Sequence, residues 1–596
     1  MNGKLPVDQW RVLFFSPNAG LWQTSQLEHE LANGLAKQGA QVAVIRCRGI
    51  FDSYCPTMQA NLLTPGSTKA EKANICKSCR REEENLRSDS SYSTIWMDDY
   101  LTSEARAAVD GEMDSITASN WDSVQREGIQ VGKYATYLSM LHHKVPDITS
   151  TSSSWAEYLS DLKNSLYAAT ALPVILEDFN PTHCVVYNPL YPTNRVFTEL
   201  ALQNKKIQYI GISTSGYVPE RLSTLALYRS IKSSQTAVDS KTLQDSMNVP
   251  MSELEISLVA RHIGQLVRGS DPWVYSTPPT SQTLDAIKQA LGISNELPVA
   301  LVVIGSPDET RSSALVDAEF ERVPIDEVSS VQEFIEQILE IARKMPDINF
   351  VFRLHPRLAP NKREKLRSPD LDVIEGLLER RSSNVVVNVP NDGIGLYDVA
   401  RIAQLGINHA SSAGLELLAL GIPVVHYDPP RLNAYPPGLG LEVSRFDQEG
   451  LHGAIEQATQ TPGSEVNAVD AWRWFAVTLL RAVTHKSWNS AQPEEITESE
   501  PTFQWLRNLL PEGFRERVSR AQSQRKRNQK TSFHTEFGNS PTWIMECITR
   551  MSDLDNSTIW NPTAITRGTP LAASREAHLV FTEVEKIRAH ISGVEN

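Results

Sequence analysis

Cysteine is scarce in this sequence of 596 residues, which contains only six. Secreted scaffolds held by disulfides use far more cysteine, so that class is excluded. No window approaches the roughly 18 unbroken apolar residues that a membrane-spanning helix needs. The first apolar stretch stops at Pro17 and is too short for a signal peptide. These absences predict a cytoplasmic protein.

Basic residues are outnumbered as well: 57 Lys and Arg stand against 71 Asp and Glu, a formal net charge of −14. An acidic surface argues against a nucleic-acid partner, which normally requires a basic one. Hydrophobic residues at 41% and charged residues at 21% are typical of a globular chain and exclude a disordered one or a coiled-coil rod. The length predicts three or four folding units, or two large ones with embellishments.

The first half of the chain has the pattern of a parallel α/β sheet. A short apolar run at 12–15, helical spacing from Leu27 to Leu35 and an alternating run at 41–46 predict a strand, a helix and a strand. A second such unit has strands at 182–187 and 207–212 around a helix from about Asn194. The polar residues from about 50 to 160 predict helical insertions into this sheet.

A second α/β block follows a proline-rich connection at 269–282. Strands are predicted at 298–304, 349–354, 384–389, 406–408 and 423–426, with a loop at 305–309 after the first. The fold class is therefore α/β, with two facing doubly wound Rossmann-like domains. The expected boundaries are 1–282, with the insertion at about 50–160, then 283–490, and a C-terminal extension over 491–596.

Two segments of the second block have the chemistry of a phosphate site. Ser411, Ser412 and Gly414 stand where a strand passes into a helix, and free backbone N–H groups at such a turn favour a phosphate. His355 and Arg357 follow another strand at the same predicted sheet edge. Alternatively, the two serines only cap the helix, and Glu416 only complements its dipole.

These motifs together resemble a known family. Ser-Pro-Asp-Glu at 306–309, His-Pro-Arg at 355–357 and Ser-Ser-Ala-Gly-Leu-Glu at 411–416, followed by Gly-Ile-Pro-Val-Val, are similar to bacterial surface-carbohydrate glycosyltransferases. The resemblance extends to the capsule-polysaccharide synthesis group, which includes transferases of the ulosonic acid Kdo. Leu27-Glu28-His29-Glu30-Leu31 resembles the N-terminal domain of related lipopolysaccharide transferases. The resemblance covers roughly residues 10–80 and 180–460.

The resemblance implies the GT-B fold and a sugar transfer in cell-surface polysaccharide assembly. Its partners would be a nucleotide-sugar donor on the C-terminal domain and a glycan or glycolipid acceptor facing the N-terminal domain. Ser411, Ser412 and Gly414 would then hold the donor phosphates, Glu416 the ribose, and His355 with Arg357 the charge of the leaving group. Two alternatives remain open: a nucleotide-sugar epimerase of the same fold, and a non-catalytic glycan-binding or assembly partner.

Inverting transfer needs a base that takes the proton of the acceptor hydroxyl. Glu28 and His29 are candidates because the first β-α turn faces the acceptor in this architecture. Glu309, with its neighbour Asp308, forms a second candidate pair at the donor sheet edge. The alternatives are an ordinary solvated charge on a helix for Glu28 and solvated loop acids for the second pair.

No cofactor is expected for catalysis, but four cysteines cluster in the sequence: Cys47, Cys55, Cys76 and Cys79. Four thiols with one C-x2-C pair suit a structural zinc ion. Free thiols and an iron–sulfur cluster remain alternatives. Separately, Arg515 to Lys530 carries seven basic residues, which would allow peripheral association with anionic lipid at the inner face of the membrane. A solvated run of charge is the other interpretation.

Overall fold

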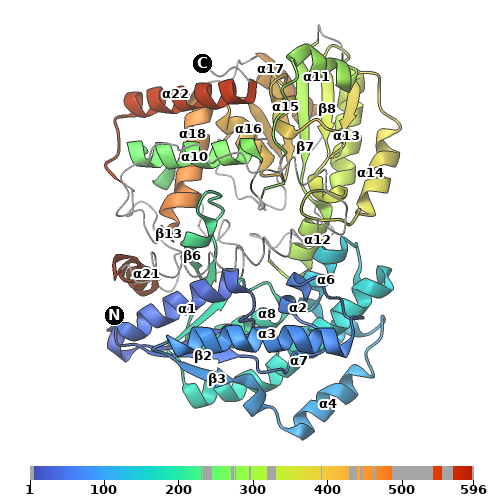
Figure 1. Ribbon diagram of the computed structural model, residues 1–596. Helices are drawn as coiled ribbons and strands as arrows, with labels where there is room; N and C mark the ends of the chain where they lie inside the picture. Colours follow the sequence, from blue (N-terminus) through green and yellow to red (C-terminus); the bar gives the residue numbers. More distant parts are fainter. Residues whose placement is uncertain are drawn as a thin grey trace, which may run out of the picture.

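The computed structural model describes residues 6–229, 231, 245–269, 271, 274–275, 277–293, 297–318, 330–390, 392–427, 439–442, 448–460, 465–485, 541–553 and 568–592. Two β-sheets, each with helices on both faces, account for most of these residues (Figure 1). The α/β class predicted from the sequence is confirmed.

The first sheet has seven strands in the order β13-β6-β5-β4-β1-β2-β3. Its strands are β1 (Arg11–Phe15), β2 (Gln41–Arg46), β3 (Ser93–Trp96), β4 (His183–Tyr187), β5 (Gln208–Ser213), β6 (Thr224–Tyr228) and β13 (Val483–His485). Strands β1 to β5 are parallel, whereas β6 and β13 are antiparallel to their neighbours. Strand β3 lies inside the stretch predicted to be helical. Its exposed or half-buried residues give it the weak apolar signal of an edge strand.

Alternate residues along the strands of the first sheet belong to two hydrophobic cores, one on each face of the sheet. Leu13 and Phe15 pack against α7 (Ser152–Phe179) and α8 (Pro192–Gln203) on one face. Val12 and Phe14 pack against α1 (Trp22–Lys37) on the other. The predicted insertion contains the remaining helices α2 (Pro56–Ala60), α3 (Lys69–Ser88), α4 (Ser103–Met113), α5 (Val131–Tyr134) and α6 (Thr136–His143).

The second sheet has six strands in the order β12-β11-β10-β7-β8-β9, and every pair is parallel. Its strands are β7 (Val299–Ile304), β8 (Asn349–Arg353), β9 (Val385–Asn388), β10 (Leu405–His409), β11 (Val424–Tyr427) and β12 (Leu441–Glu442). One face packs on α13 (Val331–Lys344) and α14 (Asp370–Leu378), the other on α15 (Leu396–Ala400) and α16 (Ala413–Ala419).

Both sheets reverse their strand order at the centre. In the first sheet the reversal lies between β1 and β4, and in the second between β7 and β10. Loops that leave the carboxyl ends of such a central pair diverge to opposite faces of the sheet and form the usual ligand-binding crevice of open α/β sheets. The loops after β1, β4, β7 and β10 are therefore where functional residues are expected.

The packing does not follow the predicted domain boundaries. Strand β13, which was assigned to the second domain, pairs with β6 of the first sheet. Helix α10 (Glu253–Arg268), which was assigned to the first domain, packs with α18 (Glu465–Phe475) and α22 (Ala573–Ser592) in the core of the second sheet. Both differences arise from partners hundreds of residues away in the sequence.

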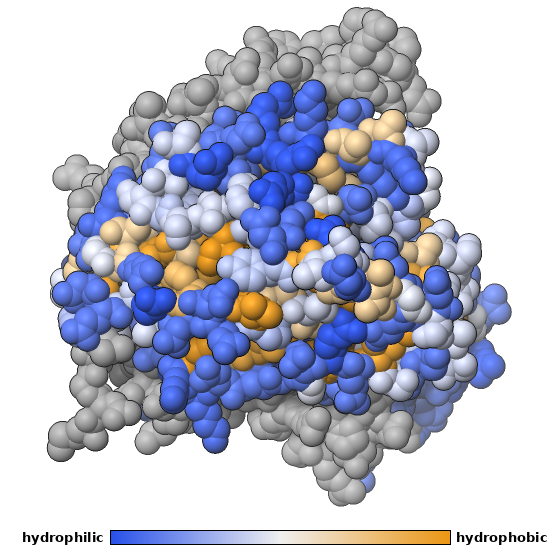
Figure 2. Space-filling model, turned by 90° about the horizontal axis from the view of Figure 1, so that it is seen from below, coloured by the Kyte–Doolittle hydropathy of each residue, from blue (hydrophilic) through white to orange (hydrophobic). Residues whose placement is uncertain are grey.

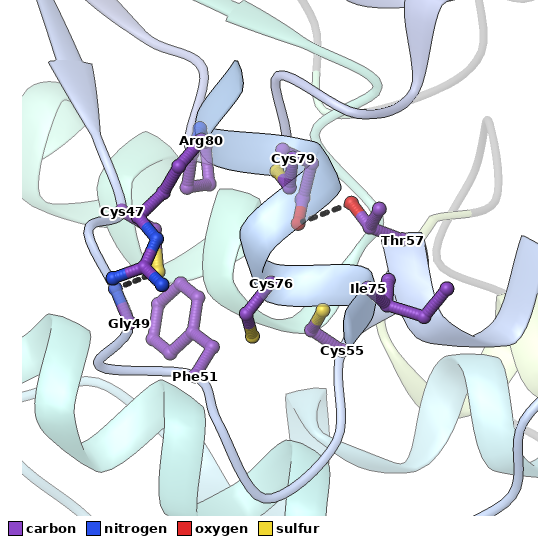
Figure 3. A pocket seen from close by; sticks show the side chains of 11 residues that line it. Cys47, Gly49, Phe51, Cys55, Thr57, Ile75, Cys76, Cys79 and Arg80 are labelled. Atoms are coloured by element: carbon purple, nitrogen blue, oxygen red, sulfur yellow. Dashed lines mark hydrogen bonds between the residues drawn. The ribbon is translucent and has the colours of Figure 1, made fainter. Parts of the chain in front are cut away.

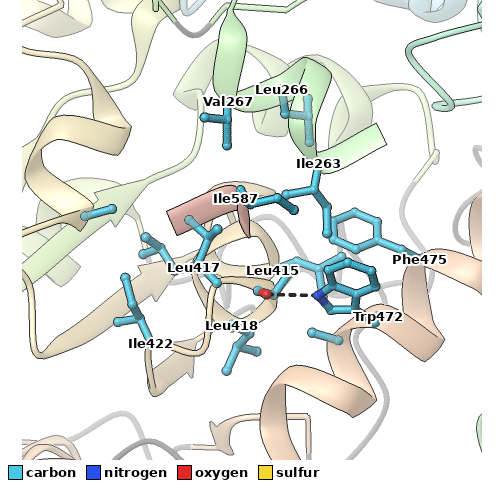
Figure 4. Packing of buried hydrophobic residues seen from close by; sticks show 14 of the residues in the cluster. Ile263, Leu266, Val267, Leu415, Leu417, Leu418, Ile422, Trp472, Phe475 and Ile587 are labelled. Atoms are coloured by element: carbon cyan, nitrogen blue, oxygen red, sulfur yellow. Dashed lines mark hydrogen bonds between the residues drawn. The ribbon is translucent and has the colours of Figure 1, made fainter. Parts of the chain in front are cut away.

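Two helices of the predicted C-terminal extension contribute to hydrophobic cores, one to the core of each sheet. Helix α21 (Pro541–Asp553) packs on α1 and β13. It comes so close that a Cβ on Gly34 would lie 2.1 Å from the Cδ1 atom of Ile544. Helix α22 packs over the second sheet, where Ile587 lies with Trp472 and Leu417 (Figure 4). Helices α21 and α22, which lie in the region of weak periodicity after residue 490, therefore pack on the two sheets.

In the described ranges, no helix is both long enough and apolar enough to cross a membrane. Figure 2 shows one face of the first sheet's unit, where apolar side chains form a band among polar ones. The basic segment from Arg515 to Lys530 lies outside the described residues, so its predicted association with lipid stays a prediction.

Candidate functional site

The second sheet brings three predicted motifs to one edge. Glu309 follows β7, His355 and Arg357 follow β8, and Ser411 to Glu416 follow β10. These three strands are adjacent in the order β10-β7-β8. All are parallel, so their carboxyl ends lie on the same edge, beside the central reversal.

The turn after β10 is shaped by close backbone contacts. Ala410 has a left-handed backbone with φ 49°, which is uncommon for a residue with a Cβ. The N–H of Gly305 donates to the carbonyl of His409 at 2.7 Å. A Cβ on Gly414 would lie 2.4 Å from the amide nitrogen of Asn408. Gly414 is thus required for packing the turn against β10, and its predicted contact with a donor phosphate stays a prediction.

The two serines of this turn have different surroundings. Ser411 is 7% exposed, and its hydroxyl accepts the N–H of Ala413 at 3.3 Å, as a capping residue does. Ser412 is exposed, and its side chain makes no capping bond to α16. The alternative interpretation, that the serines only cap the helix, therefore applies to Ser411 and does not apply to Ser412.

Glu416 lies one turn further along α16. The hydroxyl of Tyr397 donates to its Oε2 atom at 2.6 Å. Burial raises the pKa of Glu416 to about 7, and the bond from Tyr397 opposes that rise. The carboxyl group therefore interacts with α15 rather than with the helix dipole alone, and it is poised between its charged and neutral forms at neutral pH.

All three guanidinium nitrogen atoms of Arg357 already donate hydrogen bonds within the protein. Its guanidinium donates to Asp308, to Glu364 at 2.6 Å and to the hydroxyl of Tyr275 at 3.3 Å. It also donates to the backbone carbonyl of Leu141 at 2.8 Å. Arg357 is 8% exposed, so a phosphate would have to displace carboxylates that already neutralise it. In this arrangement Arg357 holds α6 against the second sheet, and its predicted role at the leaving group stays a prediction.

His355 is a neutral hydrogen-bond donor. Its Nδ1 atom accepts the backbone N–H of Arg357 at 3.2 Å, which leaves the proton on Nε2. Burial lowers the pKa of His355 to about 4, although Asp308 opposes the effect. A neutral imidazole with a fixed Nε2–H suits a phosphate oxygen without adding charge.

Asp308 and Glu309 lie in the first turn of α12 (Pro307–Leu315), where a loop was predicted. Pro307 at the first helical position starts this helix. Asp308 is buried, accepting from the hydroxyl of Ser306 and from Arg357. It is not a solvated loop acid.

Glu309 remains reachable by solvent, because 48% of its side chain is exposed. Protein nevertheless surrounds it on several sides, and this burial raises its pKa to about 7; Arg357, 3.5 Å away, opposes the rise, and Asp308 adds to it. Glu309 also interacts electrostatically with Tyr137 of α6, so it lies at the junction of the two sheets. An accessible carboxylate with a pKa near 7 has the properties of a general base.

Glu28 is not the solvated helix charge of the alternative interpretation. It is 4% exposed, and its Oε2 atom accepts the hydroxyl of Ser16, which directly follows β1, at 2.5 Å. Buried Arg46 donates to the same hydroxyl at 2.6 Å. Burial raises the pKa of Glu28 to about 7, against the bond from Ser16 and the charge of Arg46. The structure thus gives three carboxyl groups with a pKa near 7: Glu28 beside the central reversal of the first sheet, and Glu309 and Glu416 beside that of the second.

The side chain of His29, next to Glu28, contacts Tyr92. Its Nδ1 atom lies 2.9 Å from the hydroxyl of Tyr92, and the side chain is 8% exposed. This contact fixes the ring in the packing between α1 and the segment before β3. The proposed catalytic role of His29 stays a prediction without a geometric feature in its favour.

The sequence analysis missed Lys144, which joins the two sheets. It is 1% exposed and has a left-handed backbone with φ 54° at the end of α6. Its ammonium group donates to the carbonyls of Arg357 and Leu366, the latter at 2.8 Å, and lies 3.0 Å from Glu364. Nothing in the local sequence His-His-Lys distinguishes it from a surface lysine.

The four predicted metal ligands come together in one pocket (Figure 3). Cys47, Cys55, Cys76 and Cys79 all line it, together with Arg80. All four are free thiols. Over the part of the chain that the structure describes, however, no three or more Cys, His, Asp or Glu side chains are arranged to hold a metal ion. The convergence of the thiols is as expected, and zinc binding stays a prediction.

No protein-family model matches the sequence, and no curated protein does. Among solved structures, sucrose-phosphate synthase from Thermosynechococcus elongatus is 12% identical with a TM-score of 0.29, covering 79% of this chain and 95% of that one. The Neisseria meningitidis UDP-GlcNAc 2-epimerase bound to UDP-GlcNAc is 13% identical with a TM-score of 0.24, covering 79% and 99%.

A third similar structure is the beta Kdo 2,4 transferase KpsC of Thermosulfurimonas dismutans. It is 14% identical with a TM-score of 0.29, and the match covers 49% of this chain and 87% of that one. The neighbours thus include glycosyltransferases, one of them a Kdo transferase, and UDP-GlcNAc 2-epimerases. With TM-scores this low, the likeness supports no conclusion about the activity of this chain.

Proposed function

We propose that this protein is a glycosyltransferase that moves a sugar from a nucleotide-sugar donor to a glycan or glycolipid acceptor in cell-surface polysaccharide assembly. The observation that carries the proposal is Glu309. It is an accessible carboxylate with a pKa near 7, at the junction of two doubly wound sheets and beside the predicted donor motifs. The motif resemblance at 306–309, 355–357 and 411–416 supports the same assignment.

In this proposal the donor lies at the carboxyl edge of the second sheet. The exposed hydroxyl of Ser412 and the neutral Nε2–H of His355 donate to its phosphates. Glu416 accepts from the ribose hydroxyls. Glu309 or Glu28 takes the proton of the acceptor hydroxyl as it attacks the anomeric carbon, and the nucleoside phosphate departs with the bonding electrons.

The two other functions differ in what they do with the donor. An epimerase converts one nucleotide sugar into another without an acceptor, whereas a binding partner leaves it unchanged. Calorimetric titration with CMP-, UDP- and GDP-sugars tests whether any donor binds. Incubation followed by NMR of the sugar then separates the three functions: released nucleotide indicates a transferase, an epimerised nucleotide sugar an epimerase, and unchanged donor a binding partner. If no nucleotide sugar binds, the proposal is overturned.

The serine pair provides a matched test of the phosphate site. We expect Ser412→Ala to weaken binding of the donor about 10-fold, equivalent to about 1.4 kcal/mol, because it removes a hydrogen bond to a charged group. The melting temperature should stay unchanged, since the Ser412 side chain caps nothing.

Ser411→Ala is the control for this prediction. It removes a capping bond and should cost about 1 kcal/mol of stability. Calorimetry for affinity and thermal unfolding for stability give both values for each variant. Full donor affinity in Ser412→Ala would contradict the assignment of this turn to the donor phosphates.

A further inference from the structure

The cysteine pocket lies at the carboxyl edge of the first sheet and joins three separate segments. Cys47 directly follows β2, Cys55 is the residue before α2, and Cys76 and Cys79 lie on one face of α3. Pro17 and Asn18, from the loop after β1, line the same pocket. The two remaining cysteines, Cys184 and Cys547, are fully buried in hydrophobic cores and do not line this pocket.

Backbone N–H groups point at the sulfur atoms of this pocket. The N–H of Gly49 donates to the sulfur of Cys47 at 3.4 Å, and that of Gly20 donates to the sulfur of Cys79 at 3.2 Å. The backbone N–H groups of Thr57 and Met58, at the start of α2, interact with the sulfur of Cys55. Burial raises the pKa of all four thiols, and the amide donors oppose that rise at Cys47, Cys55 and Cys79. Amide donors around a sulfur are the usual outer-shell partners of metal-bound thiolates.

We propose that this pocket binds a thiophilic divalent cation of the zinc type through Cys47, Cys55, Cys76 and Cys79. A tetrahedral zinc ion with bonds of about 2.3 Å requires sulfur atoms about 3.8 Å apart. In the described residues no three of these thiols have that arrangement. The sulfur atoms of Cys55 and Cys76 point into the pocket, whereas that of Cys47 points toward Gly49 (Figure 3). Rotation about the Cα–Cβ bonds, among three staggered positions, moves each sulfur without moving the backbone.

Binding releases protons and changes the local charge. Each thiol gives its proton to solvent as its sulfur bonds to the cation, so four protons leave and the tetrathiolate site has a net charge of about −2. Arg80 on the pocket wall offsets part of that charge. Four protein ligands leave no open position, so the site is structural rather than catalytic.

The position of the pocket indicates which loop a bound cation would stabilise. Gly20, which donates to Cys79, lies in the loop that connects Ser16 to the helix bearing Glu28. A Cβ on Gly20 would lie 2.6 Å from Thr57 and 3.3 Å from Cys79, so this loop packs directly on the thiol pocket. The bound cation would hold Cys79 of α3 in place, and with it the loop after β1 that donates to this cysteine. The backbone around Glu28 would thereby be stabilised.

Elemental analysis of the full chain, purified without added metal, tests the proposal. We expect about one zinc per wild-type chain, and none after the double substitution Cys76→Ser and Cys79→Ser. Cys184→Ala and Cys547→Ala are the matched controls, because they remove thiols of the same protein outside the pocket, and they should retain the metal. Retention of the metal by the Cys76/Cys79 variant would overturn the proposal.

A second measurement avoids variants that fail to fold. A mercurial reagent added to wild-type protein should release one equivalent of zinc to a chromogenic chelator. Replacement by Co²⁺ should produce the intense charge-transfer band of thiolate ligands and the visible bands of a tetrahedral site. Folded, metal-free protein with four thiols that react with Ellman's reagent in this region would refute the site. Iron with acid-labile sulfide would refute it equally.

Discussion

Replacing Glu309 with Gln should lower the turnover of the donor by about 100- to 10,000-fold, the usual contribution of a general base. Glutamine keeps the size of the side chain and removes the group that accepts a proton. The base must be deprotonated to act, so kcat/KM of the wild type should rise with pH through about 7, the pKa of Glu309. The measurement is nucleotide release at a series of pH values, with water in place of an unidentified acceptor.

Glu28→Gln is the matched comparison, because burial raises the pKa of Glu28 to about 7 as well. The variant that loses the rising limb of the pH profile identifies the base. Thermal unfolding of both variants separates loss of the base from loss of the fold. Wild-type turnover with an unchanged pH profile in Glu309→Gln would remove the observation on which the proposed function depends.

Replacing Lys144 with Met should lower the free energy of unfolding by about 3 kcal/mol. Methionine fills a similar volume but leaves the carbonyls of Arg357 and Leu366 without their donor, and Glu364 without one of its two cationic partners. Breaking a buried ion pair by removing one member typically costs about 3–5 kcal/mol, and the partial exposure of Glu364 reduces that figure. Differential scanning calorimetry of the full chain would measure the effect.

Lys133→Met is the control because Lys133 also forms an ion pair across the junction. Its ammonium lies 2.9 Å from Asp317, but both side chains are about 30% exposed. Exposed pairs contribute only about 0–1 kcal/mol, so this variant should be nearly as stable as the wild type. Equal melting temperatures for Lys144→Met and Lys133→Met would show that burial of Lys144 does not stabilise the junction.

The strands that surround the site were predictable because burial on both faces leaves a strong pattern. The run at Val299–Ile304 is apolar throughout, and all six residues are buried. The parallel order then brings the ends of β7, β8 and β10 together, so the convergence of Glu309, His355 and Ser411 followed from topology alone.

What could not be predicted depends on distant partners. Glu28 lies on α1 beside Leu27, and only the fold brings Ser16 and Arg46 around its carboxylate. The sequence around Arg357 does not show that Asp308 and Leu141 accept hydrogen bonds from its guanidinium group. For the cysteines, spacing predicted that they would meet, but not the orientation of each sulfur atom.

The late return of the chain to the first sheet has a consequence for synthesis on the ribosome. Tyr228 ends β6, but α21, which packs on α1 and on β6, begins some 310 residues later at Pro541. At about 5–20 residues per second, roughly 15–60 s pass between the two. During that interval Leu27, Leu31 and Leu227 lack the cover of Ile544 and Ile548. This face of the first sheet therefore stays without part of its apolar cover until the last helices have been synthesised.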